Sequence, residues 1–506
     1  MKYNKQAKNL IVKKVTTSLT KKKDLLEKNF YEILSEQDQK NTKELGWFDA
    51  PNNTKIVSEI ETFMTEKDIN KFSKIIFLGI GGATITAEML SNMLSKSNNQ
   101  KYKIVDNIDI DELSEIAKEV IIENTLFVVM SKSGSTIEVL SQFNFFWKHF
   151  PSGENYIAIT ESGSKLYEHA IKNQFLKIFE CPKNIGGRFA SMSYLGIVPA
   201  LLMDIDMKNM MQNVIKTKNT YSVSFQDAPP SSLGKYIANA INEDFNNIII
   251  IIPENLLFFG KWIEQMIAES LGKKGTGITP VICCDINRAI NLQTKSIIIN
   301  YLESIHETFD CPVLNIKLNN ILDIGQQIYM WQVAIAYSGQ LLGINAFDQP
   351  DVEKVKIDPG AVNRVNSNQN DYSLNQEFFQ ETIKNDSCLH LLSFGKKSKK
   401  YQSLLNEQKR ILESLLQIPV NIHYAPRYLH SVGQLHKGGK TGNHFIFIDN
   451  IKMNKAKIPN YNFSFSDIAA AQLRNDSEYL TKISKKVAIT KIKDLQTITE
   501  QCTRSF

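Results

Sequence analysis

The chain has 506 residues, with 59 basic and 53 acidic side chains, and a net charge of +6. Over this length, so small an excess helps to attract anionic small molecules but does not indicate a nucleic-acid-binding protein. Hydrophobic residues make up 42% and charged residues 22%, which excludes collagen-like, coiled-coil and disordered chains. At this length we expect several domains.

The sequence carries no sign of export or membrane insertion. No stretch reaches the about 18 apolar residues that a spanning helix needs. The basic N-terminus lacks the apolar core of a signal peptide. Six cysteines without a CxxC pair indicate neither a disulfide framework nor a structural zinc site. We therefore expect a cytoplasmic protein without membrane or nucleic-acid partners.

Short β-branched runs alternate with amphipathic stretches, which is the pattern of βαβ units with parallel sheets. The first predicted unit has strands over 74–80, 103–105, 125–130 and 156–160, with helices over 84–95 and 136–149. The second has strands over 247–252, 296–300 and 312–318, with helices over 262–271 and 324–342. Residues 206–230 are predicted to join the units and to end in a loop at Pro229-Pro230. After about residue 356 one charged helix is predicted, over 399–416.

Two motifs follow predicted strands directly. Gly79-Ile80-Gly81-Gly82 allows a ligand to approach the backbone, although a structural turn explains it equally well. Ser131-Lys132-Ser133-Gly134-Ser135-Thr136 places four hydroxyls and a lysine where a helix begins. One hydroxyl suffices for a helix cap, so this segment favours a phosphate site over an N-cap. Neither motif has dinucleotide-binding or P-loop spacing.

Three further segments carry polar groups suited to chemistry. Gly186-Gly187-Arg188 presents a fork of donors for an oxyanion, or forms a turn with a surface arginine. Gln265 and Glu269 share one helix face among apolar neighbours, which suits a general base near a semi-buried wall. An exposed Gln–Glu pair is the better interpretation of that helix alone. In the segment 347–356 a helix is predicted to begin near Pro350, with Gln349, Glu353 and Lys356 on one face. A capped surface helix is the better interpretation of this segment alone.

Taken in this order, the five segments resemble phosphoglucose isomerase. The similar stretches are GIGG at 79–82, SKSGST at 131–136, GGRF at 186–189, QMIAESLGK at 265–273 and FDQPDVEKVK at 347–356. The segment 426–439 resembles the isomerase half of bifunctional transaldolase–phosphoglucose isomerases. The resemblance covers about residues 45–495.

The resemblance implies two tandem sugar-isomerase domains of the flavodoxin-like, parallel-sheet α/β class. We expect an N-terminal helical arm over 1–45, the first domain over 46–210 and the second over 211–362. Residues 363–506 are expected to form a C-terminal extension that packs on the second domain and contributes to the site. A homodimer with shared active sites is also implied.

The resemblance further implies interconversion of glucose 6-phosphate and fructose 6-phosphate without a metal or redox cofactor. Glu269 is the expected base that moves a proton between C2 and C1 through a cis-enediol(ate), and Arg188 is expected to stabilise the oxyanion. The implied substrate-binding residues are Gly82, Ser131, Lys132, Ser133, Thr136, Gly187, Gln265 and Gln349.

Ring opening in this family uses a histidine together with a lysine, which corresponds to Lys356. We rank His436 first for the histidine, then His430 and then His306. Ala83 and Asp351 depart from the family pattern, which has Ser and often Gly there. These departures leave open a preference for mannose 6-phosphate or another phosphosugar. A phosphosugar-binding regulator is the alternative outside enzymes, but such a protein would not need both Glu269 and Lys356.

Overall fold

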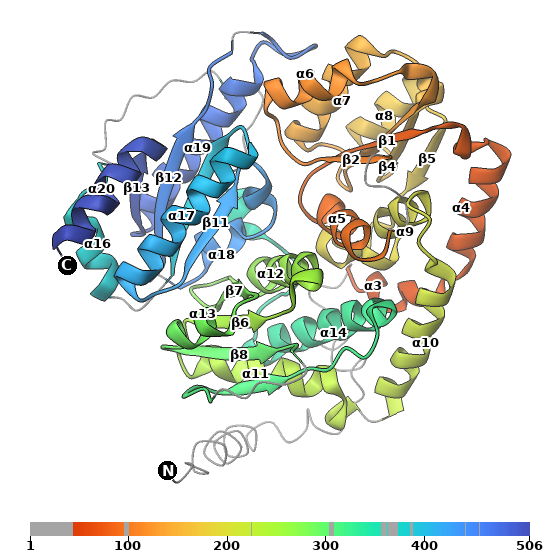
Figure 1. Ribbon diagram of the computed structural model, residues 1–506. Helices are drawn as coiled ribbons and strands as arrows, with labels where there is room; N and C mark the ends of the chain where they lie inside the picture. Colours follow the sequence, from red (N-terminus) through yellow and green to blue (C-terminus); the bar gives the residue numbers. More distant parts are fainter. Residues whose placement is uncertain are drawn as a thin grey trace.

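The computed structural model describes residues 44–95, 101–223, 225–302, 308–355, 362, 373–384, 388–440, 442–454 and 456–505. Three α/β units follow one another along the chain, each built on its own parallel sheet (Figure 1). Nearly all of the predicted arm over 1–45 lies outside these ranges. Among the described helices, none combines the length and the apolar character needed to cross a bilayer.

The first unit contains a five-stranded sheet in the order β2-β1-β3-β4-β5, which is the flavodoxin-like order. Its strands are β1 (Lys74–Gly79), β2 (Tyr102–Val105), β3 (Thr125–Met130), β4 (Tyr156–Thr160) and β5 (Lys177–Glu180). Its helices are α3 (Gly46–Asp49), α4 (Lys55–Glu66), α5 (Gly82–Leu94), α6 (Ile110–Lys118), α7 (Ile137–His149), α8 (Lys165–Lys172), the 3₁₀ helix η6 (Gly187–Met192) and α9 (Tyr194–Leu202).

The second unit repeats this order with four strands, β7-β6-β8-β9. The strands are β6 (Asn247–Ile251), β7 (Thr279–Cys283), β8 (Ser296–Asn300) and β9 (Val313–Asn315). The helices are α10 (Met207–Val223), α11 (Pro229–Asn242), α12 (Leu257–Leu271), α13 (Ile286–Asn291), α14 (Ile324–Leu342) and α15 (Pro350–Glu353).

The C-terminal segment is a third α/β unit, where the sequence predicted an extension with one helix. Its sheet again has the order β11-β10-β12-β13. The strands are β10 (Leu389–Gly395), β11 (Val420–Tyr424), β12 (His444–Asn450) and β13 (Lys486–Thr490). The helices are α16 (Gln376–Lys384), α17 (Lys399–Leu416), the 3₁₀ helix η11 (Arg427–His430), α18 (Gly433–Gly438), α19 (Phe465–Lys482) and α20 (Ile492–Ser505).

The predicted joint over 206–230 is mostly helical. The helix α10 covers its first part and crosses the predicted domain boundary at 210/211. The predicted loop at Pro229-Pro230 is wrong, because these prolines occupy the first turn of α11. Proline is tolerated there because the first amide groups of a helix have no intrahelical acceptor. The loop interpretation therefore missed a helix start.

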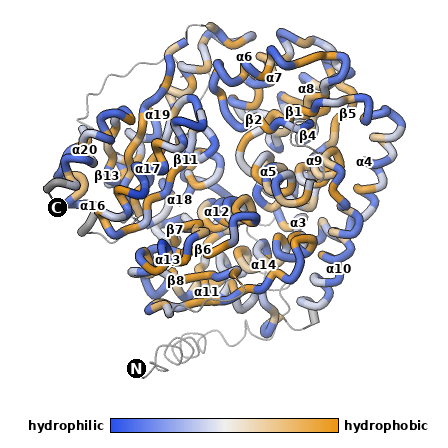
Figure 2. The backbone as a smooth tube through the Cα atoms, in the orientation of Figure 1, coloured by the Kyte–Doolittle hydropathy of each residue, from blue (hydrophilic) through white to orange (hydrophobic). Residues whose placement is uncertain are grey.

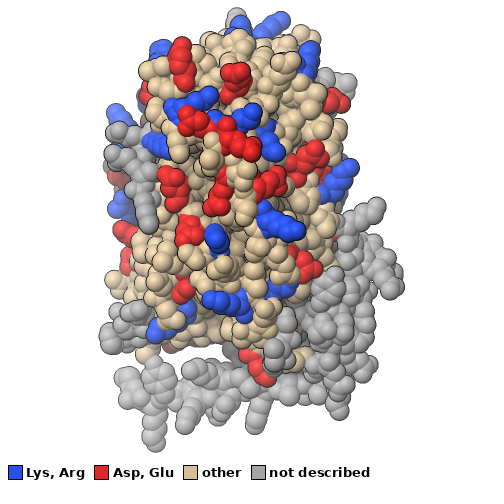
Figure 3. Space-filling view, turned by 90° about the vertical axis from the view of Figure 1, so that its right-hand side faces the viewer, with Lys and Arg blue, Asp and Glu red and all other residues tan. Residues whose placement is uncertain are grey.

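The inner strands of all three sheets are buried on both faces, as is typical of parallel sheets, whereas edge strands such as β2, β5, β9 and β13 are partly exposed. In β6, for example, all five residues are buried, and a large apolar cluster extends from this sheet to α12 and α14. Figure 2 shows the hydrophobic residues gathered in the strands and inner helices, and the hydrophilic ones along outer helix faces. On the face in Figure 3, the described acidic and basic side chains are interspersed.

The third unit is joined to the first by a largely buried ion cluster. Arg427, at the start of η11, contacts Asp106 after β2 at 2.6 Å and Glu88 on α5 at 2.5 Å. Burial by itself would raise the pKa of Asp106, but the charge and hydrogen bond of Arg427 lower it below its usual value. An exposed pair, Lys396 with Glu115, connects the same two units at 2.7 Å.

We expect Arg427→Gln to lower the free energy of unfolding by about 2–4 kcal/mol, because it leaves two buried carboxylates without a cation. The control Lys396→Gln removes an exposed pair and should cost less than about 1 kcal/mol. Urea unfolding at pH 7 measures both.

The decrease in the free energy of unfolding caused by Arg427→Gln should become smaller as the pH is lowered. The stabilisation from Asp106 is fully present above its unfolded pKa of 3.8 and is lost as pH falls through the lower folded value. Equal losses in the two variants would show that the cluster does not hold the units together.

Candidate active site

The three units meet around a cavity of about 410 Å³. Ten of the twelve predicted site residues line it: Gly82, Ser131, Lys132, Ser133, Thr136, Gly187, Arg188, Gln265, Glu269 and Gln349. It lies among the starts of α5 and α7, the last turns of α12 and the chain between β11 and α18 (Figure 1). Segments more than 300 residues apart in sequence thus share one site.

The loop 131–136 forms one wall between β3 and the N-terminus of α7. Ser131 donates to Thr136 at 3.2 Å, and Ser135 donates to Ser133 at 3.3 Å. Gly134 has φ +59°, and a Cβ there would lie 2.1 Å from Oγ of Ser164. Hydroxyls and the positive end of the α7 dipole therefore face the cavity, an arrangement suited to a phosphate group. Lys132 pairs with Glu161 at 2.7 Å at the edge of this wall.

The glycine turn before α5 makes two close contacts. Gly81 has φ +63°, and a Cβ there would lie 2.5 Å from the carbonyl oxygen of His430 in the third unit. A Cβ at Gly82 would lie 3.0 Å from the backbone of Gly187. The glycines thus let η6 and the 427–430 segment come within contact distance of the first sheet.

Arg188 is buried at the centre of the site, with 4% of its surface exposed. Its Nε donates to Ser270 at 3.0 Å, and Nη2 donates to the carbonyl oxygens of Ala346 at 3.1 Å and Asp348 at 2.7 Å. Its Nη1 lies 3.0 Å from Glu269 Oε1 and donates to Gln349 at 3.1 Å. All three guanidinium nitrogens are therefore engaged, which fixes the side chain.

Glu269 and Gln265 lie one turn apart on α12, as the sequence predicted from their spacing. Gln265 Nε2 donates to Glu269 Oε2 at 2.8 Å and to the carbonyl oxygen of His430 at 3.1 Å. One carboxylate oxygen therefore accepts from Gln265 while the other pairs with Arg188. The carboxylate is oriented at a cavity wall, where it can accept a proton from a bound molecule.

Residues 347–355 lie on the opposite side of the cavity. Lys273 pairs with Asp348 at 2.9 Å, and burial together with the charge of Arg188 lowers the pKa of Lys273 to about 7. Asp351 does not line the cavity, since its carboxylate accepts hydrogen bonds from Gln434 and Lys354. Ala83, the other residue that differs from the family pattern, does line the cavity. Lys356 lies outside the described residues.

The histidine candidates separate clearly. His430 lines the cavity, and its Nε2 donates to Glu138 at 2.9 Å. His436 is fully buried, does not line the cavity and packs beside His390 and His423 in the third unit. His306 lies outside the described residues. The placement favours His430 over His436, the reverse of the order ranked from the sequence.

Several cavity residues were not anticipated. Gln472 donates to Glu138 at 2.6 Å. Burial would raise the pKa of Glu138, but His430 and these hydrogen bonds lower it below its usual value. Lys437 and Asp476 form an ion pair with side chains only 1% exposed. Glu138 could have been noticed in the sequence, because an acidic residue near the start of an otherwise apolar helix is unusual. Asp476 could not, because it lies among other polar residues in α19.

Glu44 also lines the cavity, beside Gly186. Its pKa is raised, mainly by burial, although the charges of Lys132 and Arg188 oppose the shift. The sequence placed this residue in the N-terminal arm and gave it no role.

Known proteins that are similar to this chain in sequence are described as phosphoglucose or glucose-6-phosphate isomerases. Residues 55–283 match the family model for phosphoglucose isomerase. A probable glucose-6-phosphate isomerase of Methanococcus maripaludis is 26% identical over 377 residues, 64% of this chain and 84% of the relative. The glucose-6-phosphate isomerase of Campylobacter jejuni is 25% identical over 63% of this chain and 92% of its own length.

Two solved structures share the fold. A hypothetical protein from Thermus thermophilus superimposes with a TM-score of 0.60 at 19% identity, over 68% of this chain and 96% of that one. A glucose-6-phosphate isomerase from Chlamydia trachomatis gives a TM-score of 0.50 at 19% identity, over 59% of this chain and 71% of that one.

We expect Gly81→Ala to cost about 1–3 kcal/mol of stability beyond the strain of a left-handed alanine, because Cβ must displace His430. Gly343→Ala is the matched control, with φ +69° and nothing within 4 Å of the added carbon. Thermal unfolding compares the two. Equal shifts in Tm would contradict the close contact between the first and third units.

Proposed function

We propose that this chain interconverts D-glucose 6-phosphate and D-fructose 6-phosphate, because residues 55–283 match the phosphoglucose isomerase family model and the similar relatives are glucose-6-phosphate isomerases. The observation that carries the proposal is the Glu269 carboxylate, held between Arg188 and Gln265 at a cavity whose other wall is the hydroxyl loop. A phosphate anchor and an oriented base on one cavity are what this isomerisation requires.

The phosphate group would bind to the loop 131–136, where hydroxyls and the N-terminus of α7 donate. Binding energy from this remote group orients the reacting carbons C1 and C2 against the base. Enclosure by three units excludes water from the opened sugar, whose enediol(ate) would otherwise exchange protons freely.

Proton transfer would proceed through Glu269. Its carboxylate removes the proton from C2 of the open-chain aldose, which gives a cis-enediol(ate), and returns it to C1 to give the ketose. Arg188, whose Nη1 lies 3.0 Å from the carboxylate, would stabilise through its charge the negative charge that develops on the adjacent substrate oxygens. Its other hydrogen bonds hold the cation in place before reaction, so little reorganisation is needed.

Ring opening would use His430. A proton must move between the ring oxygen and the C1 hydroxyl, and an imidazole can both donate and accept it. The bond to Glu138 orients the ring, and Gln265 fixes its backbone. Lys356 remains the predicted partner of this histidine.

The assembly of the chain, its location in the cell and its preferred sugar are proposed on the resemblance. A homodimer is the proposed assembly. Sharing of sites is not required for the cavity described above, because residues of all three units of one chain line it. A cytoplasmic location also stays a prediction. Ala83 at the cavity wall keeps mannose 6-phosphate as a competing substrate to assay.

We expect Glu269→Gln to lower kcat by at least about 10³-fold, because the amide cannot accept the C2 proton. The control Glu264→Gln alters the same helix away from the cavity, at a carboxyl whose pKa burial raises to about 7. A coupled assay with fructose 6-phosphate measures both. Full activity in Glu269→Gln would exclude the assigned base, whereas binding without turnover by the unaltered chain would favour a regulator.

We expect His430→Gln to lower kcat by about 10²–10³-fold, because the ring-opening proton loses its carrier. His436→Gln should have a far smaller effect on kcat, since its ring does not reach the cavity. Steady-state kinetics of the folded variants decide between the two. A greater loss in His436→Gln would restore the assignment made from the sequence.

A further inference from the structure

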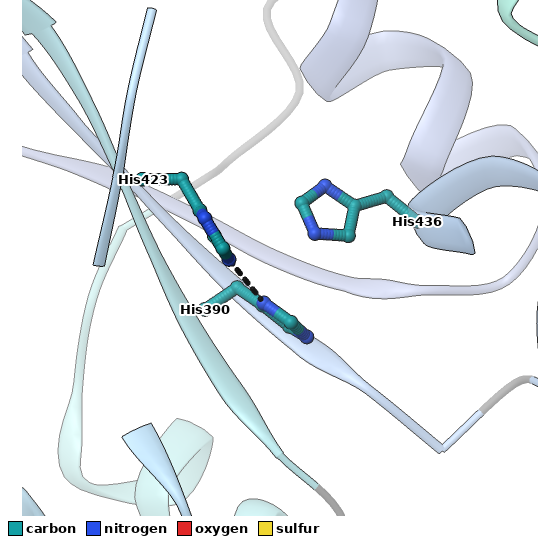
Figure 4. A group of neighbouring side chains, drawn as sticks. All are labelled: His390, His423 and His436. Carbon is teal, nitrogen blue, oxygen red and sulfur yellow. Dashed lines mark hydrogen bonds between the residues drawn. The ribbon is translucent and has the colours of Figure 1, made fainter. Parts of the chain in front are cut away.

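Three histidines from separate segments meet inside the third unit, away from the cavity. His390 lies on β10 and His423 on the neighbouring strand β11, while His436 reaches them from α18 (Figure 4). Residue 390 pairs with Asn421, two positions before 423, so both strand histidines lie on one face of the sheet. No recognised ligand spacing connects them in the sequence.

The rings leave nitrogen atoms without partners. His390 and His436 are at most 1% exposed. Both ring nitrogens of His436, and Nε2 of His390, form no hydrogen bond with any described residue. A buried imidazole nitrogen without a partner is costly, and native proteins rarely keep three together. These nitrogens are therefore free to coordinate a ligand held between the three rings.

The geometry suits a metal ion. One nitrogen of each ring lies within 4.8 Å of one nitrogen of both others. His390 Nδ1 and His423 Nε2 are 3.4 Å apart. Two ligands about 2.0–2.1 Å from a tetrahedral zinc ion are separated by roughly 3.4 Å, so this pair already has the required spacing. Only a small closing of His436 toward the pair is needed.

The rings are buried, with lysines nearby. Burial, together with nearby positive charge, lowers the pKa of His423 to about 3 and those of His390 and His436 well below the usual value. The cations concerned are Lys409, Lys437 and Lys485. Lys437 is paired with Asp476, and Lys485 donates to the carbonyl oxygens of Gly439 and Lys440.

We propose that His390, His423 and His436 bind one transition-metal ion of the zinc type. Three imidazoles favour such an ion over Mg²⁺ or Ca²⁺, which need oxygen ligands. Water or hydroxide completes the coordination. The neighbouring lysines weaken the binding of a dication.

The ion would be structural for the active site. His436 is followed by Lys437, whose side chain lines the cavity, and His430 lies shortly before α18. Coordination would fasten α18 to β10 and β11, and so hold this wall of the cavity to the third sheet. The ion would thus stabilise this wall without contacting the substrate, so loss of one ligand is expected to lower stability more than kcat.

The test uses the full chain without an affinity tag, stripped with 1,10-phenanthroline and titrated with ZnCl₂ in a calorimeter. We expect one zinc per chain and a rise in Tm, because the ion binds only the folded state. Cobalt(II) at the same site should give visible absorption bands of a tetrahedral complex. These readouts do not depend on isomerase activity. Zinc uptake far below one per chain would overturn the proposal.

Two variants test whether the zinc ion binds between the three histidines. His423→Gln removes one ligand and should weaken zinc binding by at least about 100-fold. His444→Gln is the matched control, a buried histidine on the adjacent strand β12 that bonds Thr382 at 2.6 Å and lies outside the triad. It should bind zinc as the unaltered chain does. If His423→Gln does not fold, anomalous diffraction at the zinc edge locates the ion in the unaltered chain. Density elsewhere, or equal binding by both variants, would refute the site.

Discussion

The arrangement of the site depends on the buried guanidinium of Arg188. A cation removed from water must fill its donors, so the segments that surround it have to supply acceptors in fixed positions. Here those acceptors come from α12 and from the backbone at residues 346–348. The charge therefore locks η6 of the first unit to two elements of the second. The orientation of Glu269 follows from this lock and from Gln265.

The same strand order recurs in all three sheets, and each unit contributes one part of the cavity. The first supplies hydroxyls and a helix N-terminus, the second a carboxylate, and the third a histidine and an ion pair. Glycines at 81 and 82 set the spacing, because any side chain there would separate the parts. Backbone contacts at these glycines thus determine how closely the 427–430 segment and η6 approach the start of α5.

The two first sheets were predictable because their strands are apolar runs bounded by turn residues, as in 125–130 and 156–160. Strand β5 was not predicted, because its four residues are flanked by charged ends, and strand β7 was not predicted because Pro280 interrupts it. The third sheet escaped because polar residues stand inside its strands, among them His390, His423 and His444. Motif spacing located Arg188 and Glu269. It could not locate His430, since only the contacts with Gly81 and Glu138 distinguish it from His436.

The contribution of the third unit to the cavity has a consequence for synthesis. Ribosomes make the loop 131–136, Arg188 and Glu269 more than 150 residues before His430 and Gln472 emerge. The first two units can bury their sheets while the chain is still growing, but the cavity stays open on one side. An unfinished chain would then hold the base in place without being able to enclose a sugar.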